Sequence, residues 1–415
     1  MPLSDVYPDL YGKEYDERKM NERFSTLLKD HEELFGKSDD VMIFSSSGRT
    51  EIAGNHTDHN LGKTIGGSIN LDTIGAVTKR SDKRVVLKSE GFPVVDIDIS
   101  DLGKRKEEEN TTHSLLRGIA NAFSEKGIEV GGWEANTTTN VLKGSGLSSS
   151  AAIEVLVAEI FNYIYNGDKF TPLELSKIGK YAENVYFGKP SGLLDQICSS
   201  TGGVVAIDFK DKDNPEIDKI DVDFDELGYG MIITDTKGSH ADLTAEYASV
   251  PPEMRSVASY FGKTYLSEVS YDEFLSSIGK IREKLGNDRA VLRAYHYFKE
   301  NERVEMMKKE LLDGDIETFL MLVNDSGSSS FKYLQNVFPA SDPYSQGLSI
   351  ALALSEDVLS GEGAVRVHGG GFAGTIQAYV PPYMEKKYIK RMESAFGEGC
   401  STHISIRKRP VGRIG

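Results

Sequence analysis

The chain has 415 residues, of which 39% are hydrophobic and 27% charged, and its formal net charge is −16 at pH 7. This composition is that of a globular protein with room for two domains, and the acidic balance disfavours nucleic acid as a partner. No apolar run reaches membrane-spanning length, and the N-terminus lacks the basic and apolar stretches of a signal peptide. Cys198 and Cys400 are too few for a disulfide framework. We therefore expect a cytoplasmic protein without a membrane partner.

In chain order, residues 16–36 have the apolar spacing of an amphipathic helix, and "VMIFSS" (41–46) follows as a short strand. "TIGAVTKR" and "RVVLKSE" are predicted to be two strands paired through a turn at Ser81 and Asp82. A helix at 112–126, the β-rich "WEANTTTNVL" and a long buried helix, "AAIEVLVAEIFNYIY", come next. Another helix is predicted at about 172–186.

The second half begins with the strands "GVVAIDF" and "GYGMIITDT", separated by a charged, solvated connection at 210–226 that we take as a domain boundary. Residues 240–360 are mainly helical in pattern. "AVRVHGGGFAGTIQAYV", a helix near 382–396 and the strand "THISIRK" complete the chain. This order predicts an α+β fold in two lobes, with domains at 1–220 and 221–415.

A glycine- and serine-rich turn, "NVLKGSGLSSSAAIEV" (140–155), joins a strand to a helix. The start of a helix has unpaired N–H groups and attracts anions, glycines let the backbone approach a phosphate, and serine hydroxyls can bind its oxygens or a magnesium ion. A serine that caps the helix is the alternative, but it explains only one of the three serines. The turn therefore predicts a phosphate site made by Gly144, Ser145, Gly146, Leu147, Ser148, Ser149 and Ser150.

Other phosphate-loop patterns are incomplete. "LGKT" (61–64) and "FGKT" (261–264) resemble the end of a Walker A motif, but its first glycine is replaced by Thr57 and Val257. "GGGFAG" (369–374) matches G-x-G-x-x-G, yet a strand follows it where a dinucleotide fingerprint needs a helix. Protein-kinase companion motifs are absent from the sequence. By itself this loop is also explained by a tight hairpin.

The segment "GRTEIAGNHTDHNLG" (48–62) concentrates polar side chains near a strand end. These groups can hydrogen-bond several hydroxyls at once, as a sugar requires. A metal cluster of His56, Asp58 and His59 fits no standard ligand spacing, and a polar surface loop is the plain alternative.

Taken together, these segments resemble the galactokinases, members of the GHMP superfamily of small-molecule kinases. "GRTEIAGNHTDHNLG" is similar to the family's sugar signature, "KGSGLSSSAA" to its ATP loop and "GGGFAG", with Gly371, to its third motif. "FGKPSGLLDQ" resembles the segment of the catalytic aspartate, and "TDTKGSHADLTAEY" the stretch that ends in a sugar-contacting tyrosine. The resemblance implies a ribosomal-S5-like N-terminal lobe, a ferredoxin-like C-terminal lobe and an active site between them. It also implies a monomer that transfers the γ-phosphoryl group of ATP to the anomeric hydroxyl of a galactose-type sugar.

The resemblance further assigns roles to individual residues. Asp195 is the expected base, and Arg49 is expected beside it, keeping it ionised and countering charge on the phosphoryl group. A capping carboxylate and a surface salt bridge are the structural alternatives. Mg²⁺ is expected at Glu183 and at Ser149 or Ser148. The sugar site is expected to comprise Asn55, His56, Asp58, Gly192 and Tyr247.

Several positions depart from the family pattern. Asn55 replaces the usual glutamate that meets the C6 hydroxyl of the sugar, and His59 replaces a tyrosine. The paired arginines after Tyr247 are missing, although Arg255 is close. A neutral amide tolerates a C6 hydroxyl or carboxylate, so galacturonate, N-acetylgalactosamine and L-arabinose stay open as substrates.

Two more distant readings are disfavoured. "SSSAA" and Asp195 disfavour a non-catalytic sugar sensor, and "HTD" and "LLDQ" disfavour a mevalonate or homoserine kinase. Cys198, near Asp195, has no basic neighbour in sequence and is predicted to be a core residue.

Overall fold

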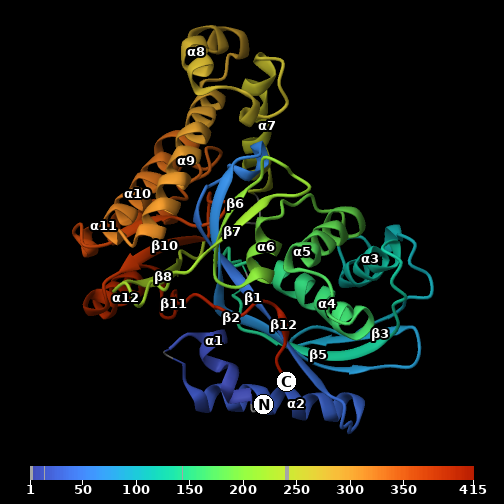
Figure 1. Cartoon of the computed structure of the whole chain (residues 1–415). Coiled ribbons are helices and arrows are strands. Elements are labelled where there is room, and N and C mark those ends of the chain that lie inside the picture. Colours follow the sequence, from blue (N-terminus) through green and yellow to red (C-terminus); the bar gives the residue numbers. More distant parts are fainter. Residues whose placement is uncertain (1–2, 14, 143, 239–242) are drawn as a thin grey trace.

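Two β-sheets organise the chain in a computed structural model that describes residues 3–13, 15–142, 144–238 and 243–415 (Figure 1). The larger sheet has the order β12-β1-β2-β5-β3-β4, and β6 pairs with the first residues of β2 and with β7. Its strands are β1 (Met42–Ala53), β2 (Lys63–Lys79), β3 (Arg84–Ser89), β4 (Val95–Asp98), β5 (Trp133–Thr139), β6 (Val204–Asp208), β7 (Glu216–Ile220) and β12 (Gly412–Arg413). The smaller sheet, β11-β8-β10-β9, contains β8 (Gly230–Asp235), β9 (Ala364–Val367), β10 (Thr375–Val380) and β11 (Ser401–Ile404).

Helices cover both sheets (Figure 1). Around the larger sheet lie α1 (Tyr7–Tyr11), α2 (Glu17–Phe35), α3 (Thr112–Glu125), α4 (Ser149–Asn166), α5 (Pro172–Tyr181) and α6 (Leu194–Thr201). The smaller sheet is covered by α10 (Ile316–Ser329), α11 (Gly347–Leu359) and α12 (Pro382–Phe396). An elongated unit of α7 (Thr244–Tyr260), α8 (Tyr271–Leu285) and α9 (Asp288–Asp313) places α8 at its far tip. Among the described residues, no helix is long and apolar enough to cross a membrane.

The local signals in the sequence predicted several of these elements. The helix predicted at 16–36 is confirmed as α2, because the Asp16 side chain accepts a hydrogen bond from the Lys19 N–H while Phe24 and Leu27 are buried. The helix predicted near 382–396 is confirmed as α12, which begins at Pro382. The strand after "GGGFAG" is confirmed as β10.

Three local predictions were wrong. β2 and β3 do not pair with each other: β5 lies between them, antiparallel to β2 and parallel to β3. The turn between them is bonded to the chain that enters β5, since the Arg80 N–H donates to the Gly132 carbonyl and the Gly132 N–H to the Asp82 carbonyl. "VMIFSS" is only the start of a strand that continues to Ala53, and the charged connection at 210–226 contains β7.

Polar groups buried beneath the larger sheet tie the two ends of the chain together. Asp72, on β2, is fully buried, and its carboxylate accepts hydrogen bonds from Ser45 and from Arg23 of α2, each at 2.6 Å. Arg407, also fully buried, lies 3.6 Å from the same carboxylate. Burial opposes the charge, but these two cations hold the pKa of Asp72 below its usual value. The segment before β12 therefore supplies one of the two cations that neutralise Asp72.

The smaller sheet contacts β1 of the larger sheet directly. Arg366, on β9, donates to the Ile52 carbonyl at 2.6 Å, and Gln377, on β10, donates to the Thr50 hydroxyl at 2.6 Å. The Thr375 hydroxyl donates to the Ser145 carbonyl at 2.8 Å. These bonds place the β9–β10 turn, which carries "GGGFAG", against both β1 and the glycine- and serine-rich turn.

Candidate active site

A polar cavity of about 190 Å³ opens where β1, the start of α6 and the β9–β10 turn meet. Its walls carry both signs of charge, and most of its members come from the segments "GRTEIAGNHTDHNLG" and "FGKPSGLLDQ". The lining residues are Arg49, Glu51, His56, Asp58, His59, Glu183, Lys189, Ser191, Gly192, Leu194, Asp195, Gln196, Gly369 and Gly370.

The expected contact between Arg49 and Asp195 is confirmed. The Arg49 Nε donates to Oδ1 of Asp195 at 2.8 Å, and its Nη2 lies 2.7 Å from the same oxygen. Oδ2 accepts a hydrogen bond from the Ser148 hydroxyl at 2.6 Å. Burial favours the neutral acid, but Arg49 and Ser148 outweigh it and hold the pKa of Asp195 below its usual value. Arg49 is buried, so this is no surface salt bridge, and the Asp195 side chain keeps 39% of its surface exposed to the cavity.

Ser148, the second residue that hydrogen-bonds to Asp195, belongs to the glycine- and serine-rich turn. Ser148 precedes α4 with a left-handed backbone (φ 58°), and its side chain does not cap the helix. Arg49 also donates to the Gly146 carbonyl, and its own N–H donates to the Leu147 carbonyl at 3.0 Å. Because no described side chain caps the first turn of α4, its N–H groups remain available to an anion.

A second cavity, of about 610 Å³, lies on the other side of this turn. Ser149, Ser150 and Glu154 line it beside the start of α4. The rest of the lining is mixed, with the apolar side chains of Leu87, Phe92, Pro93, Val95, Leu115, Leu116, Val141, Leu142, Ile153 and Val157 and the polar ones of Thr73, Ser89, Glu90, Thr112, Thr137, Thr138, Thr139 and Asn140. Gly144 and Ser145 belong to the same turn, although neither lines this cavity. Its size and lining suit a ligand that has a flat ring system at one end and a charged group at the other, with the charged group at the start of α4.

A buried glutamine joins the two cavities. The Gln196 amide donates to Glu154 at 3.0 Å, on the side of the larger cavity, and to Glu183 at 3.2 Å, on the side of the polar cavity. Glu183 also forms an ion pair with Lys189 at 2.7 Å. Burial, and then the charge of Glu183, raise the pKa of Glu154 to about 8, and its Oε1 has no hydrogen-bond partner.

The turn after β1 brings Asp58 and His56 to the polar cavity. A Cβ added at Gly192 would lie 2.7 Å from Oδ2 of Asp58, so a side chain there would shift this carboxylate from its position. Burial, and then His59, lower the pKa of His56 to about 4, so its ring is neutral at pH 7 and donates through Nε2 to the Gly370 carbonyl at 2.9 Å.

Asn55 does not line the cavity. Its side chain is fully buried and donates to Glu51 Oε1 at 2.9 Å and to the Gly369 carbonyl at 2.6 Å. Its carbonyl oxygen accepts from Asn336 at 2.7 Å and from Ser330 at 3.3 Å. These four bonds use both donors and both acceptor positions of an amide.

Tyr247 is in contact with Gly371 of the β9–β10 turn, and neither residue lines the polar cavity. The Tyr247 hydroxyl donates to the Gly371 carbonyl at 2.7 Å, and its ring packs against Phe372. A Cβ added at Gly371 would lie 2.0 Å from the Asn336 carbonyl oxygen, so this glycine is required for packing. Within the family-like segments, Lys143 and residues 239–242 lie outside the described residues.

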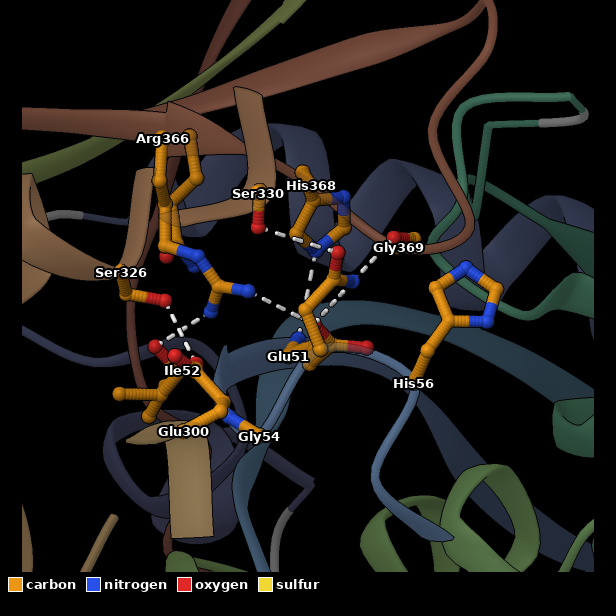
Figure 2. A network of polar contacts seen from close by, with 12 residues as sticks. Glu51, Ile52, Gly54, His56, Glu300, Ser326, Ser330, Arg366, His368 and Gly369 are labelled. Carbon is orange, nitrogen blue, oxygen red and sulfur yellow. Dashed lines mark hydrogen bonds and ion pairs between the residues drawn. The ribbon is translucent and has the colours of Figure 1, made fainter. Parts of the chain in front are cut away.

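Sequence reasoning missed Glu51, Glu154, Lys189 and Gln196. Of these, Glu51 was the easiest to predict from the sequence. Side chains two positions apart on a strand lie on the same face, and Arg49 had already been selected as a site residue. Figure 2 shows Glu51 between Arg366 and His56. Cys198 is confirmed as a core residue; it is buried, and burial raises the pKa of its thiol.

Comparison with known proteins places this site in a class. The model of the GHMP kinases N terminal domain matches residues 114–203, and the galactokinase galactose-binding signature matches residues 29–79. The fold is similar to the crystal structure of Lactococcus lactis galactokinase complexed with galactose, with a TM-score of 0.80 and 25% identity, over 94% of this chain and 100% of that one. Methanococcus jannaschii mevalonate kinase has the same fold, with a TM-score of 0.64 and 14% identity over 89% of this chain and 99% of that one. The chain is thus a kinase of the GHMP type, and the predicted two-lobed α+β fold is confirmed.

Proteins related in sequence narrow the class to one family. The galactokinase of Lacticaseibacillus casei is 30% identical over 393 residues, which cover 92% of this chain and 96% of that protein. The galactokinase of Lactococcus lactis subsp. lactis is 29% identical over 398 residues, covering 94% and 95% of the two chains. This chain belongs to the galactokinase family and is a sugar kinase that uses ATP.

Proposed function

We propose that this chain transfers the γ-phosphoryl group of ATP to the anomeric hydroxyl of α-D-galactose. The observation that carries the proposal is the contact of Asp195 with both Arg49 and Ser148. Through it, an ionised carboxylate at a sugar-sized polar cavity touches the glycine- and serine-rich turn, to which we assign the phosphates. A base and a phosphate site in contact are what direct phosphoryl transfer to a hydroxyl requires.

In the proposed reaction, Asp195 orients the attacking hydroxyl and accepts its proton. Its low pKa suits a loose transition state, in which the proton leaves late and positioning matters more than basicity. Arg49 neutralises the charge of Asp195 and lies beside Gly146, where it also faces the transferred group. Asp58 accepts hydrogen bonds from ring hydroxyls, and Gly192 keeps the space that this carboxylate needs.

For ATP, we propose that the larger cavity takes the base while Gly144 to Ser150 take the phosphates. Mg²⁺ is implied by the family, and the residues fit it: Glu183 and Ser149 offer oxygen ligands of the kind it prefers, and Glu154, whose Oε1 has no partner, would offer another once the cation displaces its proton. No cluster of three or more acidic, histidine or cysteine residues that could hold a metal occurs among the described residues, and phosphate oxygens would complete the coordination. When bound, the ion would supply positive charge to neutralise the phosphates. Here Gln196 holds Glu154 and Glu183 in place.

A sugar panel tests the proposal. ATP consumption is measured with galactose, galacturonate, N-acetylgalactosamine, L-arabinose and glucose, and phosphorus–proton coupling in the product spectrum identifies the phosphorylated carbon. We expect turnover of galactose at C1, abolished by EDTA and restored by excess Mg²⁺. Phosphate on another carbon, or turnover of none of these sugars, would refute it. The domain limits 1–220 and 221–415, a monomeric state and a cytoplasmic location stay predictions.

A further inference from the structure

The Glu51 side chain extends from β1 to the polar cavity. One of its carboxylate oxygens accepts hydrogen bonds from the protein, and the other does not. Oε1 accepts hydrogen bonds from Asn55 and from Arg366, both at 2.9 Å. Oε2 has no hydrogen bond to any described residue, yet it is not shut off from solvent, and the side chain is 8% exposed at the cavity wall. A buried carboxylate is costly unless each oxygen finds a donor, so Oε2 lacks one that a ligand can supply.

The surroundings fix this orientation. Arg366 is fully buried and also donates to the Ile52 carbonyl, so its guanidinium cannot turn toward Oε2 without losing that bond. On the other side, Asn55 has filled its hydrogen-bonding capacity with protein partners. Asn55 stands at the position where the family has the glutamate that contacts the C6 hydroxyl. In this chain Asn55 instead holds the Glu51 side chain in place.

The charge of the cavity favours a neutral ligand. Glu51, Asp58, Glu183 and Asp195 line it. Arg366, Lys189 and Arg49 pair with Glu51, Glu183 and Asp195, respectively, and among the described residues Asp58 has no arginine or lysine partner, which leaves a net negative charge. Sugar hydroxyls donate to such oxygens, whereas a carboxylate on the sugar would meet like charge.

We propose that Glu51 determines sugar specificity: its Oε2 accepts a hydrogen bond from one hydroxyl of a neutral galactose-type sugar and excludes a sugar with a carboxylate at that position. The inference rests on the proposed function, and it replaces the expectation that Asn55 reads this part of the sugar.

The test compares Glu51→Gln with Glu300→Gln. Glu300 is a buried carboxylate that accepts hydrogen bonds from the Gly54 N–H at 3.2 Å and from Ser326 at 2.6 Å (Figure 2). It does not line the polar cavity. The wild type and both variants are assayed with galactose, its 2-, 3-, 4- and 6-deoxy forms and galacturonate. A hydrogen bond to a charged group corresponds to roughly a tenfold or larger effect, so Glu51→Gln should lower kcat/KM for galactose by about that factor, mainly through KM.

One deoxy sugar should respond differently, because it lacks the hydroxyl that Glu51 accepts from. For it, wild type and Glu51→Gln should have similar kcat/KM, and the preference of the variant for galactose over galacturonate should narrow. Glu300→Gln should lower the thermal unfolding midpoint without changing the ratios between sugars. An equal loss for every sugar, or no loss, overturns the inference. If Glu51→Gln fails to fold, Glu51→Asp, which retains the charge beside Arg366, takes its place in the same panel. Failure of the wild type on every sugar would instead refute the proposed function.

Discussion

Asp195→Asn should remove most of the turnover and leave the fold intact. The amide retains an oxygen for Arg49, which donates to Oδ1 at 2.8 Å in the wild type, and its NH₂ group faces the Ser148 hydroxyl, which can accept in place of donating. The fold should therefore persist, while the side chain loses its charge and cannot take a proton. General-base catalysis contributes about 10²- to 10⁴-fold, so kcat should fall by that range, about 3 to 5 kcal/mol in activation free energy.

The assay is ADP release at saturating galactose and ATP, with calorimetric titration of galactose and of a non-hydrolysable ATP analogue. Both ligands should bind the variant within a few-fold of the wild type. A matched control is Ser148→Ala, which removes one hydrogen bond and leaves the carboxylate. Because that bond lowers the pKa of Asp195, its loss should move the acidic limb of the kcat–pH profile upward and reduce kcat less than Asp195→Asn does. A kcat for Asp195→Asn within tenfold of the wild type would refute the assignment of the base.

Gly192→Ala would place a Cβ 2.7 Å from Oδ2 of Asp58 and displace it, so KM for galactose should rise roughly tenfold while KM for ATP stays constant. An unchanged KM for galactose would contradict this. His403→Gln tests a surface charge cluster: hydrogen bonding to Asp225, against the effect of burial and with help from Glu385, raises the pKa of His403 to about 9. The stabilisation is complete below about pH 6.5 and is lost as the pH rises through about 9. Urea unfolding should therefore show a loss of about 2 kcal/mol at low pH, after allowance for solvent screening, that disappears in alkaline solution. An equal loss at both pH values would contradict it.

Local chemistry was readable from the sequence. The start of α2 at its Asp16 cap, the start of α12 at a proline and the polar turn after β1 depend on residues a few positions apart. Arg49 and Asp195 are far apart in sequence, and here the resemblance to a family supplied what spacing alone does not contain.

Strand pairing and side-chain contacts between residues far apart in the sequence could not be predicted from the sequence. β5 enters between β2 and β3 because of a pairing decided some fifty residues later in the chain, whereas the short turn between β2 and β3 suggested a simple hairpin. The role of Asn55 is similar. An amide in a polar segment suggests a residue that binds a ligand. In the structure, its hydrogen bonds are made with Asn336 and Gly369, which come from the other half of the chain.

The pairing of β1 with β12 has a consequence for biosynthesis. Phe44 and Ser45 are partners of Arg413 and Gly412, so the outer edge of the strand that carries Arg49 is closed by residues made about 370 residues later. At translation rates of about 5–20 residues per second, that edge stays open for roughly 20 to 70 seconds. Through this interval Asp72 also lacks Arg407, and the exposed backbone can pair with another chain. The nascent chain is therefore most vulnerable to misassembly at β1, and the larger sheet should be complete only once Gly412 and Arg413 are free to pair.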